Sequence, residues 1–223
     1  VQHHLRPESL PHANKANHRL AAPRTLLCAA LLHDPIIPPM QPKCERRLIH
    51  KGAKFDFEAV SLTLPDGSVV SRDVVRHPGA VTIVPVLDDG RLLLIRNLRV
   101  ATAGWLYEFP AGTLEPPEPP IKCAARELIE ETGHRAAALT PCGTFFTSPG
   151  LSDERMFAFV ATGLSPVGQD LQEDERIEVH PTPLATVLQM LDANQADDAH
   201  RLMDAKSMLA LLLALRQKLI PTP

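Results

Sequence analysis

The chain has 223 residues, of which 44% are hydrophobic and 22% charged, and its formal net charge is −3. This length suits one domain, or one domain with an appendage, and the composition is ordinary for a soluble globular protein. The slightly negative charge lacks the basic surplus of nucleic-acid-binding proteins, and no stretch reaches the roughly 20 apolar residues that span a bilayer. We therefore expect neither a nucleic-acid partner nor a membrane span.

The four cysteines form no Cys-x-x-Cys pair and have no regular spacing. This pattern favours free thiols over a disulfide framework, and disulfides are rare in reducing compartments. We therefore expect a cytoplasmic protein.

Residues 1–39 differ from the rest of the chain. They hold five of the ten histidines and several prolines, without a sustained hydrophobic period. Their apolar run, residues 26–32, is short for a secretory signal, and no small-residue cleavage site follows it. We expect a non-domain extension here, either a leader or a disordered segment, ahead of a compact region that begins at Met40.

Residues 40–75 are expected to form a small antiparallel strand unit, because the alternating segments 59–64 and 69–75 flank a turn at 65–68. The main domain is expected to comprise residues 76–223. Its predicted strands and helices indicate an α+β or α/β fold on a mixed sheet. The strands are predicted at 81–87, 91–96, 143–148, 155–161 and 177–180, and the helices at 183–193 and 203–219.

The stretch from Gly112 to Gly133 is read as a loop that enters an acidic helix. Glu127 and Glu131 are four residues apart and share one helical face, which Glu130 borders. Like charges at this spacing repel, so they indicate a bound counter-ion, and carboxylate oxygens suit Mg²⁺ or Mn²⁺. The alternative is a solvated acidic face. The stripe that packs on the core is predicted to be Ile121, Ala125, Leu128 and Thr132.

This stretch resembles the Nudix box, whose pattern is G-x5-E-x7-R-E-U-x-E-E-x-G-U, with U a bulky apolar residue. His134 takes the place of the last apolar residue. The resemblance implies a Nudix hydrolase domain over residues 76–223, built as an α/β/α sandwich on a mixed sheet and preceded by the small strand unit. The positions that match are Gly112, Glu118, Arg126, Glu127, Leu128, Glu130, Glu131 and Gly133.

Nudix enzymes hydrolyse diphosphate linkages of nucleoside compounds with the help of divalent cations, so the resemblance implies bound Mg²⁺, with Mn²⁺ as an alternative. It implies that Glu127, Glu131 and the Ala111 carbonyl are metal ligands, and that Glu130 is a ligand or lies beside one. Arg126 is expected to orient a carboxylate by ion pairing, since it precedes Glu130 by four residues.

The wider sequence is similar to the ADP-ribose pyrophosphatase branch of this family. Pro149 follows Gly133 by sixteen residues, as in that branch, and the segment 77–80, followed by Arg96 and Arg99, looks like the branch's segment ahead of the box. The acidic loop 173–179 looks like the loop that supplies the catalytic base. Both Glu173 and Glu175 are candidates for that base, and we favour Glu175.

The same resemblance implies that Arg99, Arg96 and Pro149 bind substrate, and that the protein is a homodimer. Trp105 is a further candidate for substrate binding, because its ring can stack on an adenine. Each candidate has a simpler alternative: Arg99 and Arg96 as surface charges, Trp105 as a core residue, the acidic loop as a solvated segment. The expected reaction is Mg²⁺-dependent hydrolysis of ADP-ribose to AMP and ribose 5-phosphate. The alternatives are another nucleoside diphosphate sugar or a dinucleotide as substrate, or a catalytically silent nucleotide-binding Nudix module.

Overall fold

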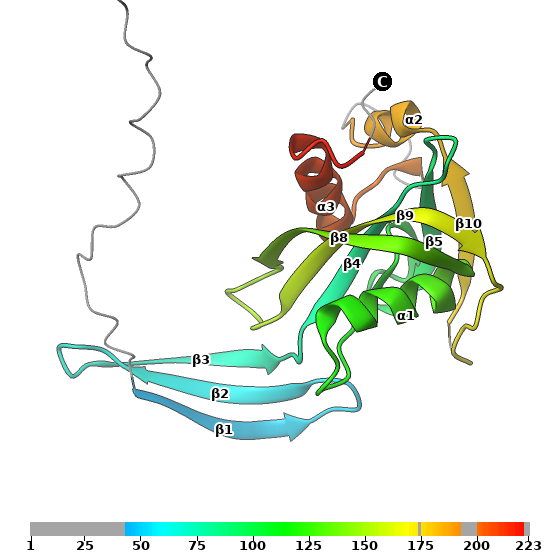
Figure 1. The fold of residues 1–223 in the computed structure, drawn as a ribbon. Helices are drawn as coiled ribbons and strands as arrows, with labels where there is room; N and C mark the ends of the chain where they lie inside the picture. Colours follow the sequence, from blue (N-terminus) through cyan, green and yellow to red (C-terminus); the bar gives the residue numbers. More distant parts are fainter. Residues whose placement is uncertain (1–42, 174, 193–199, 221–223) are drawn as a thin grey trace, which may run out of the picture. The chain divides into compact units, whose positions relative to one another are not determined.

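The computed structural model describes residues 43–173, 175–192 and 200–220. The chain divides into two units, residues 1–41 and 42–223, and all the described residues belong to the second unit (Figure 1). The predicted extension over residues 1–39 therefore lies outside the described residues, and so does the start of the predicted strand unit.

Three antiparallel strands come first: β1 (Lys43–Lys51), β2 (Asp56–Thr63) and β3 (Val69–Arg76). In the turn between β2 and β3, the Asp66 carboxylate accepts the Ser68 N–H at 2.9 Å. Gly67 has φ of 82°, a conformation that suits glycine. The hairpin predicted from residues 59–75 is therefore present.

The main body holds two sheets. In the larger one, with strand order β7-β4-β9-β8, only β4 and β9 run parallel, so the sheet is mixed as predicted. Its strands are β4 (Ala80–Pro85), β7 (Ala111–Thr113), β8 (His134–Phe146) and β9 (Arg155–Pro166). The smaller sheet is antiparallel, with strand order β10-β5-β6. It contains β5 (Leu92–Arg99), β6 (Gly104–Glu108) and β10 (Ile177–Thr182), and the short 3₁₀ turn η1 (Val100–Thr102) joins β5 to β6.

Helices cover both faces of the larger sheet (Figure 1). Alternate residues of β4 point to opposite faces: Val81 and Ile83 join one buried cluster with Leu128 of α1 (Pro120–Thr132). Val84 joins the other cluster with Leu211 of α3 (Ala205–Arg216). The short helix α2 (Leu184–Gln189) also packs on this second cluster. The α/β/α sandwich and the α+β class are thus confirmed.

Helix α1 buries a different stripe from the predicted one. Leu128 and Thr132 are buried as expected, but Ile121 is 45% exposed. The core side of the helix instead carries Cys123, Ala124, Glu127, Leu128 and Glu131. The two glutamates can lie on this side because polar groups of the neighbouring loop and of Arg126 contact their carboxylates, a tertiary effect that hydrophobic spacing does not reveal.

Several other elements differ in extent from the sequence prediction, among them β9, which runs to Pro166 rather than to residue 161. β8 begins directly after the box at His134, nine residues before the predicted strand start at 143. Its first half is rich in alanine and has no clear alternation of apolar and polar residues, and its register with β9 shifts between Pro141 and Gly143. The helices α2 and α3 are shorter than predicted, since α2 ends at Gln189 and α3 ends at Arg216.

Candidate active site

The loop that precedes the box helix lies directly against it. β7 pairs with β4 and presents Gly112 to Glu127, and a Cβ at position 112 would overlap the Glu127 carboxyl group. Only glycine lets the carboxylate approach the backbone this closely. At the other end of α1, Gly133 adopts the left-handed conformation at φ of 70° and caps the helix, as predicted.

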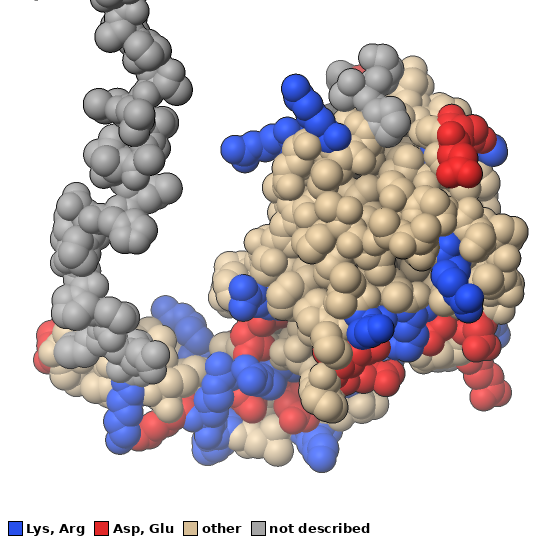
Figure 2. Space-filling view, in the orientation of Figure 1, with Lys and Arg blue, Asp and Glu red and all other residues tan. Residues whose placement is uncertain are grey.

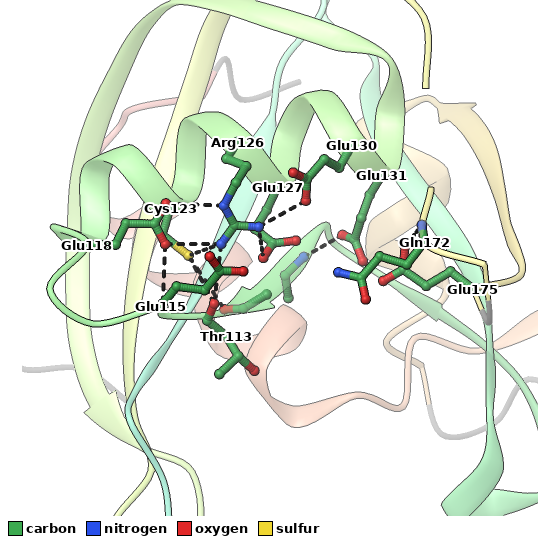
Figure 3. Close-up of polar contacts among 12 residues, drawn as sticks. Thr113, Glu115, Glu118, Cys123, Arg126, Glu127, Glu130, Glu131, Gln172 and Glu175 are labelled. Carbon is green, nitrogen blue, oxygen red and sulfur yellow. Dashed lines mark hydrogen bonds and ion pairs between the residues drawn. The ribbon is translucent and has the colours of Figure 1, made fainter. Parts of the chain in front are cut away.

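Arg126 is the centre of an ion-pair network on α1 (Figure 3). Its guanidinium donates to both oxygens of Glu118, at 3.1 and 3.0 Å. A third nitrogen donates to Glu127 at 2.7 Å and to Glu130 at 2.9 Å. The pair with Glu130 was expected from the four-residue spacing. The contacts to Glu118 and Glu127 were not, and together the three pairs hold the box carboxylates in fixed orientations.

Glu131 lies deeper than the other carboxylates of the box, with only 3% of its surface exposed. Its Oε2 accepts the Ala111 backbone N–H at 2.8 Å. Within the described part of the chain, no cationic side chain contacts it. Burial raises the pKa of Glu131 to about 8, and the negative charge of Glu127 adds to this effect.

Glu127 shows the same tendency to a smaller degree. Burial is the main cause that raises the pKa of Glu127 to about 7, and the ion pair with Arg126 offsets part of it. The negative charges of Glu130 and Glu175 raise it further. The two buried carboxylates therefore lie in surroundings that are short of positive charge.

The acidic loop between β9 and β10 brings one of its two candidate bases to this cluster. Glu175 is half-buried, its carboxylate accepts the Gln172 N–H at 2.9 Å, and its charge acts on both Glu127 and Glu131. Figure 3 shows its side chain beside that of Glu131. Glu173 is exposed, and its carbonyl oxygen accepts from Arg176. The geometry thus places Glu175 at the cluster.

The two arginines proposed for substrate binding lie on opposite faces of β5. Arg99 donates to Glu108 through two nitrogens, at 2.8 and 2.6 Å. Its side chain lies on the same face of the sheet as Ile95, which pairs with Glu108 across β5 and β6. Arg96 points the other way, over the ring of Trp105 at 5.1 Å. A separation of three residues in a strand always gives this result, because successive side chains alternate.

Pro149 is exposed in the turn that joins β8 to β9. The following residues bind to the end of β3: Ser152 forms a bridge with Val75, and Asp153 pairs with Arg76. The structure therefore fastens this turn to the three-stranded sheet and shows no contact between Pro149 and the described box carboxylates.

The donor set around Gly112 fits a divalent cation. Carboxylate oxygens are the ligands that Mg²⁺ and Mn²⁺ prefer. A cation would add positive charge to a cluster in which Arg126 alone serves Glu118, Glu127 and Glu130. Among residues 43–173, 175–192 and 200–220, no three His, Cys, Asp or Glu side chains already stand close enough to hold a metal by themselves. Instead Glu127 faces Arg126, and Glu131 faces the Ala111 N–H.

Comparison with known proteins agrees with this site. Residues 76–206, more than half of the chain, match the NUDIX domain family. The chain belongs to the Nudix family. The resemblance inferred from the box is thereby confirmed, and the buried carboxylates of α1 are the Nudix-box carboxylates.

Two bacterial proteins and one solved structure are similar to this Nudix protein over most of its length. It is 37% identical to the ADP-ribose pyrophosphatase of Bacillus subtilis (strain 168) over 153 residues, which cover 68% of this chain and 83% of the relative. It is 32% identical to the methanol dehydrogenase activator of Bacillus methanolicus, over 73% of this chain and 86% of that one. The crystal structure of an ADP compounds hydrolase superposes with a TM-score of 0.66 at 28% identity, covering 80% and 94% of the two chains.

Sequence reasoning missed Glu108 and Lys206, which contact each other at 2.7 Å beside the site. The only hint was one charged residue, Glu108, inside the otherwise apolar and aromatic segment 105–109. Nothing in the sequence indicates that its partner lies 98 residues further along the chain.

Proposed function

We propose that this protein hydrolyses the diphosphate linkage of ADP-ribose, with Mg²⁺, to give AMP and ribose 5-phosphate. The observation that carries the proposal is the pair of buried carboxylates, Glu127 and Glu131, which lie beside Glu175: Glu127 shares Arg126 with two other glutamates, and Glu131 contacts no cationic side chain of the described residues. The 37% identity to an ADP-ribose pyrophosphatase supports the choice of substrate.

The roles of the residues follow from the charge balance of the reaction. A diphosphate is polyanionic and repels a nucleophile, and a bound divalent cation supplies the positive charge that offsets this repulsion. Glu127, Glu131 and the Ala111 carbonyl would hold it, with Glu130 as a further ligand. Arg126 keeps Glu127 and Glu130 in place through its ion pairs.

Glu175 is the proposed general base. Its carboxylate takes a proton from the attacking water while a phosphorus–oxygen bond forms, and the bond between that phosphorus and the bridging oxygen breaks. The position of Glu175 on a loop, within electrostatic reach of Glu127 and Glu131, supports this role over Glu173. Arg99 is the proposed phosphate contact, and the roles of Arg96, Trp105 and Pro149 in binding substrate stay predictions.

We also propose that the protein is a homodimer that uses its three-stranded sheet. This sheet exposes large apolar side chains, which a second copy would bury. On the face shown in Figure 2, basic and acidic side chains are interspersed around α1 and this sheet. This face therefore lacks the continuous basic surface that binds nucleic acid. The exposed apolar residues are Leu48, Ile49, Phe57, Val69 and Val70.

No helix among the described residues is long and apolar enough to cross a membrane. The three described cysteines, Cys44, Cys123 and Cys142, are free thiols. We propose a reducing, cytoplasmic setting, which the free thiols of these cysteines support.

A second candidate substrate class is another nucleoside diphosphate sugar. The GDP-mannose pyrophosphatase of Cronobacter sakazakii is 35% identical over 151 residues, and the box carboxylates serve the shared diphosphate in either case. The intact box glutamates and the similarity to ADP-ribose pyrophosphatases of two bacteria argue against a catalytically silent nucleotide-binding module.

The test is to incubate the protein with ADP-ribose, ADP-glucose, GDP-mannose or NADH and Mg²⁺, and to identify the products by chromatography. AMP and ribose 5-phosphate, formed fastest from ADP-ribose and abolished by a chelator, would support the proposal. Faster turnover of another compound would reject ADP-ribose as the substrate. If a variant with both Glu127→Gln and Glu131→Gln turned over as fast as the parent, the proposed catalytic site would be wrong.

A further inference from the structure

Glu108, at the end of β6, is a buried carboxylate held by two cations. Only 1% of its surface is exposed. Arg99 donates to both of its oxygens, at 2.8 and 2.6 Å, and the Lys206 ammonium donates to Oε2 at 2.7 Å. Burial on its own would raise the pKa of Glu108, but the pairs with Arg99 and Lys206 lower it. This carboxylate is therefore charged and fully compensated.

Lys206 ties this group to the start of α3. Its ammonium also donates to Asp204 at 2.7 Å, and Asp204 is the N-cap of α3, accepting the Ser207 N–H at 3.1 Å. The Ser207 hydroxyl in turn accepts the Phe109 N–H at 2.7 Å. The helix start thus holds both the side chain of Glu108 and the backbone next to it. Two cations and two anions balance in this network.

Arg99 is held so that one edge of its guanidinium stays available. Its Nε and Nη2 are used by Glu108, and Nη1 makes no hydrogen bond within the described part of the chain. The side chain is 40% exposed, and its charge acts on Glu131. A planar guanidinium fixed along one edge can present the remaining N–H groups to a phosphate at little entropic cost.

We propose that Glu108 and Lys206 are positioning residues, which together hold Arg99 in the orientation that binds the diphosphate of the substrate. The inference rests on the proposed function, in which Arg99 contacts phosphate. Lys206 acts through Glu108, because it fixes the carboxylate to which Arg99 donates. In this way it connects α3 to the catalytic site.

The simpler alternative is that the network only fastens α3 to β6. The two interpretations differ in whether removing Lys206 and removing Arg99 change KM independently. If Lys206 works through Arg99, its removal has no further effect once Arg99 is absent, whereas two independent effects multiply. Stability alone cannot produce such coupling in a binding constant measured well below the unfolding temperature.

The experiment compares the full-length parent with Lys206→Met, Arg99→Met and the double variant, using ADP-ribose and Mg²⁺. We expect Lys206→Met to raise KM about tenfold with kcat within about twofold, and the double variant to have the KM of Arg99→Met alone. Lys206→Arg should restore most of the loss. Arg216→Met, which removes an exposed charge at the other end of α3, is the matched control and should leave KM unchanged.

A KM for the double variant equal to the product of the two single effects would overturn the proposal, and so would an unchanged KM for Lys206→Met. If Lys206→Met does not fold, Asp204→Asn replaces it, because asparagine keeps the N-cap acceptor and removes the charge that Lys206 contacts. It should raise KM in the parent and leave it unchanged in the Arg99→Met background.

Calorimetric binding of inorganic pyrophosphate to the same four proteins separates this inference from the proposed function. If the parent turns over no substrate, the proposed function fails, yet weaker pyrophosphate binding by Lys206→Met, with no further loss in the double variant, would still support the positioning role. Equal binding by the parent and Lys206→Met, or no binding by the parent, would reject it.

Discussion

Glu131 on α1 and Glu108 on β6 are two glutamates with nearly the same burial, 3% and 1% exposed, and opposite electrostatic surroundings. Glu108 contacts two cations, and its pKa is lowered. Glu131 receives one backbone N–H, and its pKa is raised to about 8. Neither burial nor residue type separates them; the number of positive partners does.

The difference distinguishes a structural carboxylate from one that is prepared for a ligand. A buried charge that is paired on all sides has no capacity for another cation, and breaking its pairs leaves uncompensated charges behind. A buried carboxylate with a deficit of positive charge is costly to the folded protein alone and becomes favourable when a cation arrives from solution. The following predictions test this contrast.

The largest effect is expected on activity, from Glu131→Gln. Glutamine keeps an oxygen to accept the Ala111 N–H but removes the charge that would hold a cation, so we expect kcat to fall by about a thousandfold or more. In the absence of metal at pH 8, the variant should unfold at the same temperature as the parent or higher, because a buried charge is removed. Rate assays and thermal denaturation with chelator would check both, and a destabilised variant would contradict the argument.

Glu108→Gln should behave in the opposite way. Loss of this charge leaves Arg99 and Lys206 without their shared partner, so we expect the free energy of unfolding to fall by about 3 kcal/mol, the usual cost of breaking a buried ion pair. Urea denaturation would measure it. An unchanged midpoint would mean that Glu108 is not a structural charge, and the contrast with Glu131 would be lost.

The stability of the metal-free protein should depend on pH through the box. The folded-state pKa values of Glu127 and Glu131, about 7 and about 8, lie above the ordinary value of 4.5. Their stabilising contribution is complete below about pH 4.5 and is lost as the pH rises through those two values. We therefore expect an unfolding free energy lower by on the order of 5 kcal/mol at pH 8.5 than at pH 5.5, of which Glu131 contributes the larger part.

Thermal denaturation with chelator across this pH range would measure that loss. The variant with both Glu127→Gln and Glu131→Gln should show a flatter profile. Mg²⁺ should stabilise the parent more at the higher pH, because its ligands must be deprotonated. A parent profile that rises between the two pH values would contradict the raised pKa values.

The smallest effect is expected at an exposed pair. Glu178 and Arg96 lie 3.5 Å apart on the surface of the smaller sheet. Exposed ion pairs contribute little, so Glu178→Gln should change the free energy of unfolding by less than about 0.5 kcal/mol and leave turnover of ADP-ribose unaltered. Urea denaturation and rate assays would check both expectations, and a clearly larger loss of stability would show that burial does not decide how much an ion pair contributes here.

Local features of this protein could be predicted from its sequence because they depend on near neighbours. The hairpin of β2 and β3 follows from alternation around a turn at Gly67, and the box helix with its Gly133 cap follows from spacing. Arg126 and Glu130 are separated by one helical turn, so their ion pair could also be predicted from spacing. Strand periodicity also predicts that Arg96 and Arg99 point to opposite faces of the sheet, although the sequence prediction assigned both to the same substrate site.

The sequence by itself therefore determined the family, the helix that carries the carboxylates, and the residue types that suit a divalent cation. Only the tertiary structure decided that Glu127 and Glu131 face the core, that Glu131 contacts no cationic side chain of the described residues, that Glu175 rather than Glu173 reaches them, and that Lys206 holds Glu108. The reason is physical: helical and strand spacing act over a few residues, whereas the electrostatic surroundings of a buried group depend on side chains that chain folding brings from far along the sequence.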